Sequence, residues 1–185
     1  MFRRRPFVRP FRRAVMPNIP PALRRANELL ASGNYPAAAE AYEQLARGAQ
    51  TRGLPHDAQL FLQAGRCRLL AGQVQAGMVN LKQGLAVIAG RGNWPRLLNA
   101  ARRAVADLNA RGLTAEAAEI ETWLQQTLPE GFAAAPAAAP GRSRVLPTRC
   151  PACGAPLHAD EAEWSDEFTA ECPYCGAAVR AESSV

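Results

Sequence analysis

The chain has few of the residues from which catalytic sites are commonly built. It contains two His and five Ser among its 185 residues, so a Ser-His-Asp triad or a two-histidine metal site is hard to assemble. The carboxylates show no acid pair at a fixed spacing, and we interpret the adjacent His56 and Asp57 as a helix cap. We therefore expect a protein that is not an enzyme. Aromatic residues are also scarce, at 6%, which together with frequent Ala favours closely packed helices over a β-sandwich.

Long apolar runs are missing as well. No stretch approaches the ~18 consecutive apolar residues of a membrane helix, and the N-terminus lacks the apolar core of a secretory signal. The first acid is Glu28, so an organelle transit peptide stays open, although five prolines within positions 1–21 oppose its usual amphipathic helix. We expect a cytoplasmic protein.

Lysine is nearly absent, because Lys82 is the single Lys among 22 basic residues. The charge is uneven along the chain, and residues 1–20 form a basic arm rich in Arg and Pro. Positions 1–13 contain six Arg and no acid. These are Arg3, Arg4, Arg5, Arg9, Arg12 and Arg13. Interleaved with three Phe, they can pair with phosphates and also stack or insert, which indicates nucleic acid or an anionic membrane surface as partner. A solvated tail is the alternative.

Residues 21–128 are typical of a helical domain. Apolar residues recur at helical spacing, as at Ala38, Ala41, Tyr42 and Leu45. We predict about six helices, over 22–31, 35–47, 57–70 and 74–88, and from 93 and 114 onward. Asp57 and Thr114 are the expected caps of the third and sixth helices. Gly48, Gly53 and Pro55 indicate a longer loop after the second helix.

The predicted turns repeat along the chain. Gly33, Gly72 and Gly112 recur at a nearly constant spacing, each between two predicted helices, where a positive φ suits glycine. A fixed period of this size predicts stacked antiparallel helical hairpins. The fold class is therefore mainly α, an α-solenoid with a small C-terminal β unit.

The first hairpin resembles the tetratricopeptide repeat family. The resemblance rests on the stretch from Ala26 to Tyr42, with the turn Gly33, Tyr35 and Ala38 between them. The second hairpin fits through Phe61, Gly65, Gly72, Gly77 and Leu81, and the third less well, because Glu121 stands where a large apolar residue is expected. Since the period exceeds the family's ~34 residues, we expect insertions near 48–55 and 89–94. The resemblance implies an α-solenoid whose concave face binds a protein segment; a plain helical bundle is the alternative.

The C-terminal third carries a duplicated cysteine motif. An Ala/Pro-rich linker, residues 129–148, offers no core and allows the following piece to sit apart or to fold back. Residues 149–185 then contain two near-copies, Cys150-Pro-Ala-Cys153-Gly and Cys172-Pro-Tyr-Cys175-Gly. A Cys-x-x-Cys turn presents two sulfurs to one ion, and two such turns complete a closed four-cysteine site for one structural Zn²⁺. Iron, two disulfides and a redox pair are the alternatives.

This motif resembles the zinc-ribbon family over about residues 148–181. The resemblance implies two cysteine knuckles on short β-hairpins, and we expect Trp164 and Phe168 to form a small core and Val179 to extend the last strand. We expect His158 on the surface and Cys67 in the helical core. Because residues 129–185 carry eight acids against four basic residues, direct phosphate binding by the ribbon is disfavoured.

These features predict a non-enzymatic protein–protein interaction adaptor or assembly subunit. The helical repeats would bind a protein partner, and the structural-zinc ribbon would be a second docking module. The alternative is a nucleic-acid-associated or membrane-surface protein that acts through the Arg arm. We also expect the helical domain to fold without the ribbon.

Overall fold

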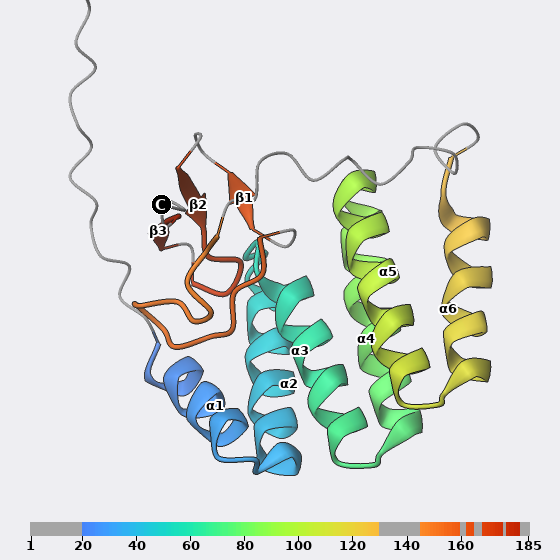
Figure 1. The fold of residues 1–185 in the computed structure, drawn as a ribbon, viewed down its shortest axis with the longest axis horizontal. Helices are drawn as coiled ribbons and strands as arrows, with labels where there is room; N and C mark the ends of the chain where they lie inside the picture. Colours follow the sequence, from blue (N-terminus) through green and yellow to red (C-terminus); the bar gives the residue numbers. More distant parts are fainter. Residues whose placement is uncertain (1–19, 130–144, 160–161, 165–167, 176, 182–185) are drawn as a thin grey trace, which may run out of the picture.

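The computed structural model describes residues 20–129, 145–159, 162–164, 168–175 and 177–181. Six helices follow one another along the chain and pack in neighbouring pairs (Figure 1). They are α1 (Pro21–Ala31), α2 (Tyr35–Thr51), α3 (Asp57–Leu70), α4 (Val74–Gly90), α5 (Trp94–Ala110) and α6 (Thr114–Thr127). The predicted mainly-α fold is confirmed. Within the described part of the chain, no helix has the length and apolar character needed to cross a membrane.

A small antiparallel sheet follows the helices. It consists of β1 (Glu163–Trp164), β2 (Thr169–Glu171) and β3 (Ala178–Arg180), hydrogen-bonded in the order β1-β2-β3. Val179 lies opposite Ala170 in the register and extends the last strand as predicted. We call the described residues from 145 to 181 the cysteine module.

The turns between helices all use the same C-terminal capping structure, in which a glycine adopts a positive φ. Gly33, Gly72 and Gly112 have φ of 78°, 73° and 76°, as the sequence predicted. Two further junctions, at Gly53 and Gly92, have φ of 65° and 69°. At each glycine the backbone N–H donates to a carbonyl three residues back in the preceding helix. Since an L-side chain is strained at such φ values, glycine is required there. The repeating unit is therefore a single helix that runs from one of these glycines to the next.

Of the two expected insertions between hairpins, only the one before α3 leaves a longer connection, at residues 52–56. Helix α2 runs through Gly48 to Thr51, and α4 runs to Gly90, so the other additional residues lengthen helices. Gly48 weakens a helix by ~1 kcal/mol relative to Ala but does not end it. The helix ends where Gly53 adopts a positive φ.

Neither Asp57 nor Thr114 occupies the N-cap position that the sequence predicted for it. Asp57 is the first residue of α3, and His56 occupies the N-cap position. The Asp57 side chain is 4% exposed and forms a 2.6 Å ion pair with Arg91, at the end of α4. Thr114 likewise begins α6 behind Leu113. The residue after the turn glycine is the N-cap of the next helix at four of the five turns, and a side-chain cap forms where that residue is Asn34 or Asn93.

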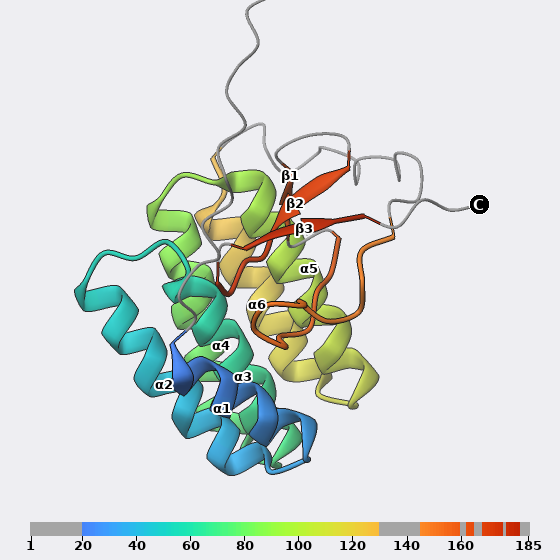
Figure 2. The same ribbon diagram turned by 90° about the vertical axis from the view of Figure 1, so that its left-hand side faces the viewer.

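Helix α3 lies between two hydrophobic cores. Leu60, Phe61, Ala64 and Cys67 face a core shared with α1, α2 and the cysteine module. Ala58, Leu62 and Leu69 face a second core, shared with α4, α5 and α6. Figure 2 shows the module packed against one side of the helical array. Because α3 is covered on both faces, it joins the module to the rest of the helical array.

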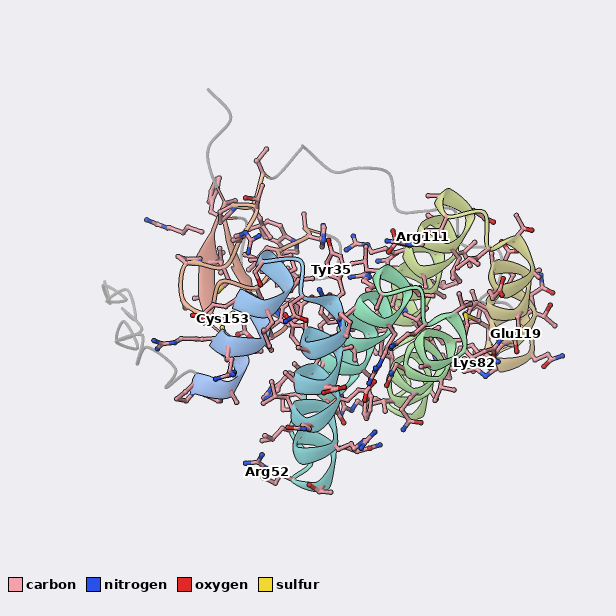
Figure 3. All side chains as sticks on the ribbon, turned by 90° about the horizontal axis from the view of Figure 1, so that it is seen from below. Tyr35, Arg52, Lys82, Arg111, Glu119 and Cys153 are labelled. Carbon is pink, nitrogen blue, oxygen red and sulfur yellow. The ribbon has the colours of Figure 1, made fainter. Side chains whose placement is uncertain are left out.

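Ion pairs join neighbouring hairpins at the surface of these cores. Glu43 on α2 accepts hydrogen bonds from Arg68 on α3, at 2.8 and 3.1 Å, and from Asn80 on α4, at 2.8 Å. The Arg68 hydrogen bond is the main reason that the pKa of Glu43 is lowered. Lys82 of α4 and Glu119 of α6 pair in the same way near the end of the array (Figure 3).

Helices α3 and α4 approach each other closely because α4 carries glycine at the contact. A Cβ atom at Gly84 would lie 2.8 Å from Leu62 Cγ and 2.9 Å from the Ala58 carbonyl oxygen. Real side-chain contacts do not come this near, so the helix axes would have to separate.

We predict that Gly84→Ala destabilises the protein by roughly 1–3 kcal/mol, because the backbone carbonyl of Ala58 cannot move aside. Gly90→Ala, in the last turn of the same helix, meets nothing within 4 Å. It should be neutral or stabilising by up to about 1 kcal/mol through helix propensity. Urea unfolding followed by circular dichroism measures both; equal effects would show that the α3–α4 contact is looser than described.

Candidate metal centre

The structure brings together the four cysteines of the duplicated motif. One sulfur from each of Cys150, Cys153, Cys172 and Cys175 lies within 4.8 Å of the others. The Sγ atoms of Cys150 and Cys175 are 3.8 Å apart, and those of Cys153 and Cys172 are 3.9 Å apart. A disulfide requires ~2.05 Å, and none of the four cysteines forms one. The arrangement is therefore a cluster of separate donors.

The donor set fits a tetrahedral metal ion. Metal–sulfur bonds of ~2.3 Å from one centre place the sulfurs of a tetrahedron ~3.8 Å apart, which matches the two observed separations. Four thiolates would fill such a centre completely, so no position would remain for a water or a substrate. A metal held here would supply a structural cross-link between two distant segments of the chain.

Both knuckles are built by the same backbone hydrogen bonds. The N–H of Cys150 donates to the Ala155 carbonyl, and that of Cys172 donates to the Ala177 carbonyl, each at 2.8 Å. Gly154 has a φ of +75° after the first pair, as expected. Its counterpart Gly176 lies outside the described residues. Sequence duplication is thus matched by duplicated local structure.

The thiols shift one another's ionisation. The Cys153 thiol, followed by those of Cys172 and Cys175, hydrogen-bonds to Cys150 and lowers the pKa of that group. The same contact with Cys150 raises the pKa of Cys172, because a second thiolate beside the first is unfavourable. All four sulfurs can be ionised together only if a cation balances their charge, which is what a divalent metal provides.

The first knuckle is hydrogen-bonded to the first helical hairpin. The buried Asn27 of α1 donates through Nδ2 to the Cys153 carbonyl at 2.5 Å, and its Oδ1 accepts from the Tyr42 hydroxyl of α2 at 2.5 Å. Tyr42 is fully buried, and this desolvation is the main reason that its pKa is raised. Figure 3 shows Cys153 beside α1. The metal-site backbone and the hairpin interior therefore belong to one network.

The second knuckle contacts α3 through Tyr174. Its hydroxyl donates to Gln63 Oε1 at 3.0 Å, and Gln59 Nε2 lies 3.3 Å from the same oxygen. All three side chains are buried. Sequence reasoning missed these residues, although Gln59 and Gln63 carry a signal: polar residues four apart beside Leu60 and Phe61 on a buried helix need a partner.

The cysteine module completes its core with helical side chains. Phe168, expected in that core, is 54% exposed, and Trp164 is half-buried and donates to the Ala159 carbonyl. The buried aromatic is Tyr174 instead. Packing also begins earlier than expected, because Leu146, within the predicted linker, is buried in the shared core. The module folds back onto the helices, which is one of the two arrangements that the sequence left open.

Other candidate residues have simpler environments. His158 is exposed, and Cys67 is fully buried in the core, where desolvation raises its pKa to about 12. Both agree with expectation. The six arginines of the arm, the linker from 130 to 144 and four acids between the two cysteine pairs (Asp160, Glu161, Asp166 and Glu167) lie outside the described residues.

We predict that Tyr42→Phe lowers stability by about 1–2 kcal/mol, because Asn27 Oδ1 would be left buried without its donor. Tyr35→Phe is the control, since Tyr35 is only half-buried and should lose little. Denaturant unfolding of the two variants measures the difference. If Tyr42→Phe behaves like Tyr35→Phe, the buried hydrogen bond contributes nothing to stability.

Comparison with known proteins returns no match, whether the chain is compared with family models, with curated proteins or with solved structures.

Proposed function

We propose that the chain is a non-enzymatic interaction protein, an adaptor or assembly subunit, stabilised by one structural Zn²⁺. Cys150, Cys153, Cys172 and Cys175 would hold the ion. The observation that carries the proposal is a cluster of four cysteine sulfurs within 4.8 Å of one another, in which the Cys153 carbonyl accepts a hydrogen bond from Asn27 of the first helical hairpin.

The donor set favours zinc for a structural role. Four soft thiolates with no open position are the usual environment of structural Zn²⁺. Iron has a similar preference for four thiolates, so elemental analysis has to separate the two. With the metal bound, the chain's own contribution is to orient the donors, through the backbone bonds of both knuckles, and to keep three of the four sulfurs out of water.

The helical pairs would supply the partner surface. The resemblance of the first hairpin to tetratricopeptide repeats supports this reading, as does the stacking of six helices into an extended array. The cysteine module covers part of the face formed by α1 and α3. We therefore place the partner on a face that the module leaves exposed, such as the outer surface of α4, where Val79 is 68% exposed.

A second candidate function is binding of RNA or an anionic membrane through the Arg arm. Beside the start of α1, a hollow of 280 Å³ is lined by Arg25 and Arg52 and by no described acidic residue. Pro20, which follows the arm arginines in the sequence, lies at this end of α1. The six arm arginines and this hollow would extend one positively charged region.

We predict that the purified, unchelated protein contains about one zinc per chain by elemental analysis. Chelation should lower the melting temperature of the helical circular-dichroism signal. Losing the Asn27–Cys153 and Gln63–Tyr174 hydrogen bonds removes about 2–3 kcal/mol, which corresponds to roughly 4–12 °C for a chain of this size.

If elemental analysis finds iron instead of zinc, the identity of the proposed metal changes but the four-cysteine site is supported. Absence of any metal, with four freely reactive thiols, would contradict the site itself. An unchanged helical melt after complete zinc removal would show that the module and the helices are energetically separate. Cys67→Ala is a useful companion variant, because it removes a cysteine outside the cluster and should retain the full zinc content.

Deletion of residues 1–14 separates the two candidate functions. If the helices bind a protein partner, the partner that co-purifies from the native host should be retained by the deletion variant. It should be lost with Val79→Asp and retained with Ala118→Asp, an exposed site on α6. If the arm is the functional element, full-length protein should bind RNA or phosphatidylserine vesicles, and the deletion variant should not.

A further inference from the structure

The four cysteines of the cluster differ in their exposure to solvent. Cys150, Cys153 and Cys172 are 2–3% exposed, whereas Cys175 is only partly buried. Tyr174, the residue before Cys175, points into the helices and bonds to Gln63. Cys175 is therefore the one cysteine of the cluster that is not fully buried.

Cys175 is one of the residues that line a pocket. The pocket has a volume of about 370 Å³ and lies between α1, α2, the start of α3 and the second knuckle. Its walls are mainly apolar, with Leu23, Leu45 and Leu60 beside Cys175. Arg52 and His56 bring basic groups to the wall, and none of the described lining residues is acidic. Such a pocket admits a small neutral or anionic oxidant without charge repulsion.

A sulfur of the first knuckle is well placed to complete a reaction at Cys175. Cys150 Sγ lies 3.8 Å from Cys175 Sγ, and closing this gap to the ~2.05 Å of a disulfide needs only a small movement. Susceptibility of cysteine to oxidation follows thiolate character and exposure, and a resolving cysteine nearby makes the oxidation reversible. Metal ligation would supply the thiolate character.

We propose that Cys175 is an oxidation site for hydrogen peroxide, with Cys150 as its resolving partner. The proposal rests on the metal site proposed above. The Cys175 thiolate attacks one peroxide oxygen, the O–O bond breaks, and hydroxide leaves, giving a sulfenic acid. The Cys150 thiolate then attacks the Cys175 sulfur, the S–O bond breaks, and a second hydroxide leaves. Two solvent protons convert both hydroxides to water, so two thiolates lose two electrons and the peroxide gains them.

The disulfide would leave two of the four thiolates at the site, and the metal would be released. The second knuckle would then lose its cross-link next to Tyr174, whose hydroxyl is bonded to Gln63 of α3. Oxidation at this partly buried cysteine would therefore loosen the contact between the cysteine module and the helices. A dithiol reductant and added zinc would reverse the change.

The experiment treats full-length, zinc-loaded protein with hydrogen peroxide. Zinc release is followed with a chromogenic chelator, and the disulfides are mapped by peptide mass spectrometry at early times. We expect Cys150–Cys175 as the first disulfide, loss of about one zinc per chain, and no modification of the fully buried Cys67. A first disulfide between Cys153 and Cys172, or oxidation of Cys67 at the same rate, would overturn the proposal.

A pair of matched variants tests access through the pocket. Ala22, the second residue of α1, is exposed and lines the pocket. Ala115, the second residue of α6, is exposed and lies at the other end of the array. Ala22→Trp should slow zinc release about threefold or more, because susceptibility follows exposure, whereas Ala115→Trp should leave the rate unchanged. Equal rates would overturn the proposed route.

The two proposals can fail separately. Protein that carries no metal before peroxide is added contradicts the proposed structural site. Protein that carries zinc, but forms its disulfides in no preferred order, contradicts only the oxidation site. If Ala22→Trp fails to fold, as judged by circular dichroism, the disulfide map of the unmodified protein still decides the question.

Discussion

The structure depends on one constraint: the short cysteine module cannot bury a sufficient core by itself. It meets this constraint by sharing the core of the first helical hairpin, where Asn27 donates to the Cys153 carbonyl and Tyr174 is inserted beside α3. Buried polar groups of this kind must be paired, since an orphaned one costs about 1–3 kcal/mol. The position of the module on the helices is therefore set by hydrogen-bond geometry as well as by apolar contact.

Helix α3 transmits this arrangement to the remaining helices. One face contributes Leu60 and Phe61 to the core shared with the module, and the opposite face contributes Leu62 and Leu69 to the core of the later helices. A helix covered on both faces loses the amphipathic stripe of a surface helix. The buried glutamines of α3 are tolerated in this apolar environment because the Tyr174 hydroxyl of the second knuckle hydrogen-bonds to their side chains. A disturbance of the cysteine cluster would thus reach α1 through Asn27 and α3 through Gln63.

Local signals in the sequence predicted the helices and the cysteine cluster well. Glycines that need a positive φ mark the turns, and two Cys-x-x-Cys pairs are short-range patterns that tertiary context does not alter. The errors came from residues whose role depends on a distant partner. Asp57 pairs with Arg91 and does not cap its helix, and Phe168 is exposed because Tyr174 fills the shared core. Such pairings connect positions far apart in the chain, so no local pattern contains them.

The location of the module also constrains how the helices could act. In a stack of helical hairpins, a partner segment needs a continuous surface on successive helices. Here the module already covers part of the face of α1 and α3, and its Pro156 and His158 reach a hollow lined by Arg103 of α5. A partner would therefore have to bind an exposed face or displace the module. Displacement would break the buried hydrogen bonds of Asn27 and Gln63, and the metal would oppose it by holding both knuckles together. An intact metal centre thus favours binding on the exposed face, and its loss would uncover a second surface.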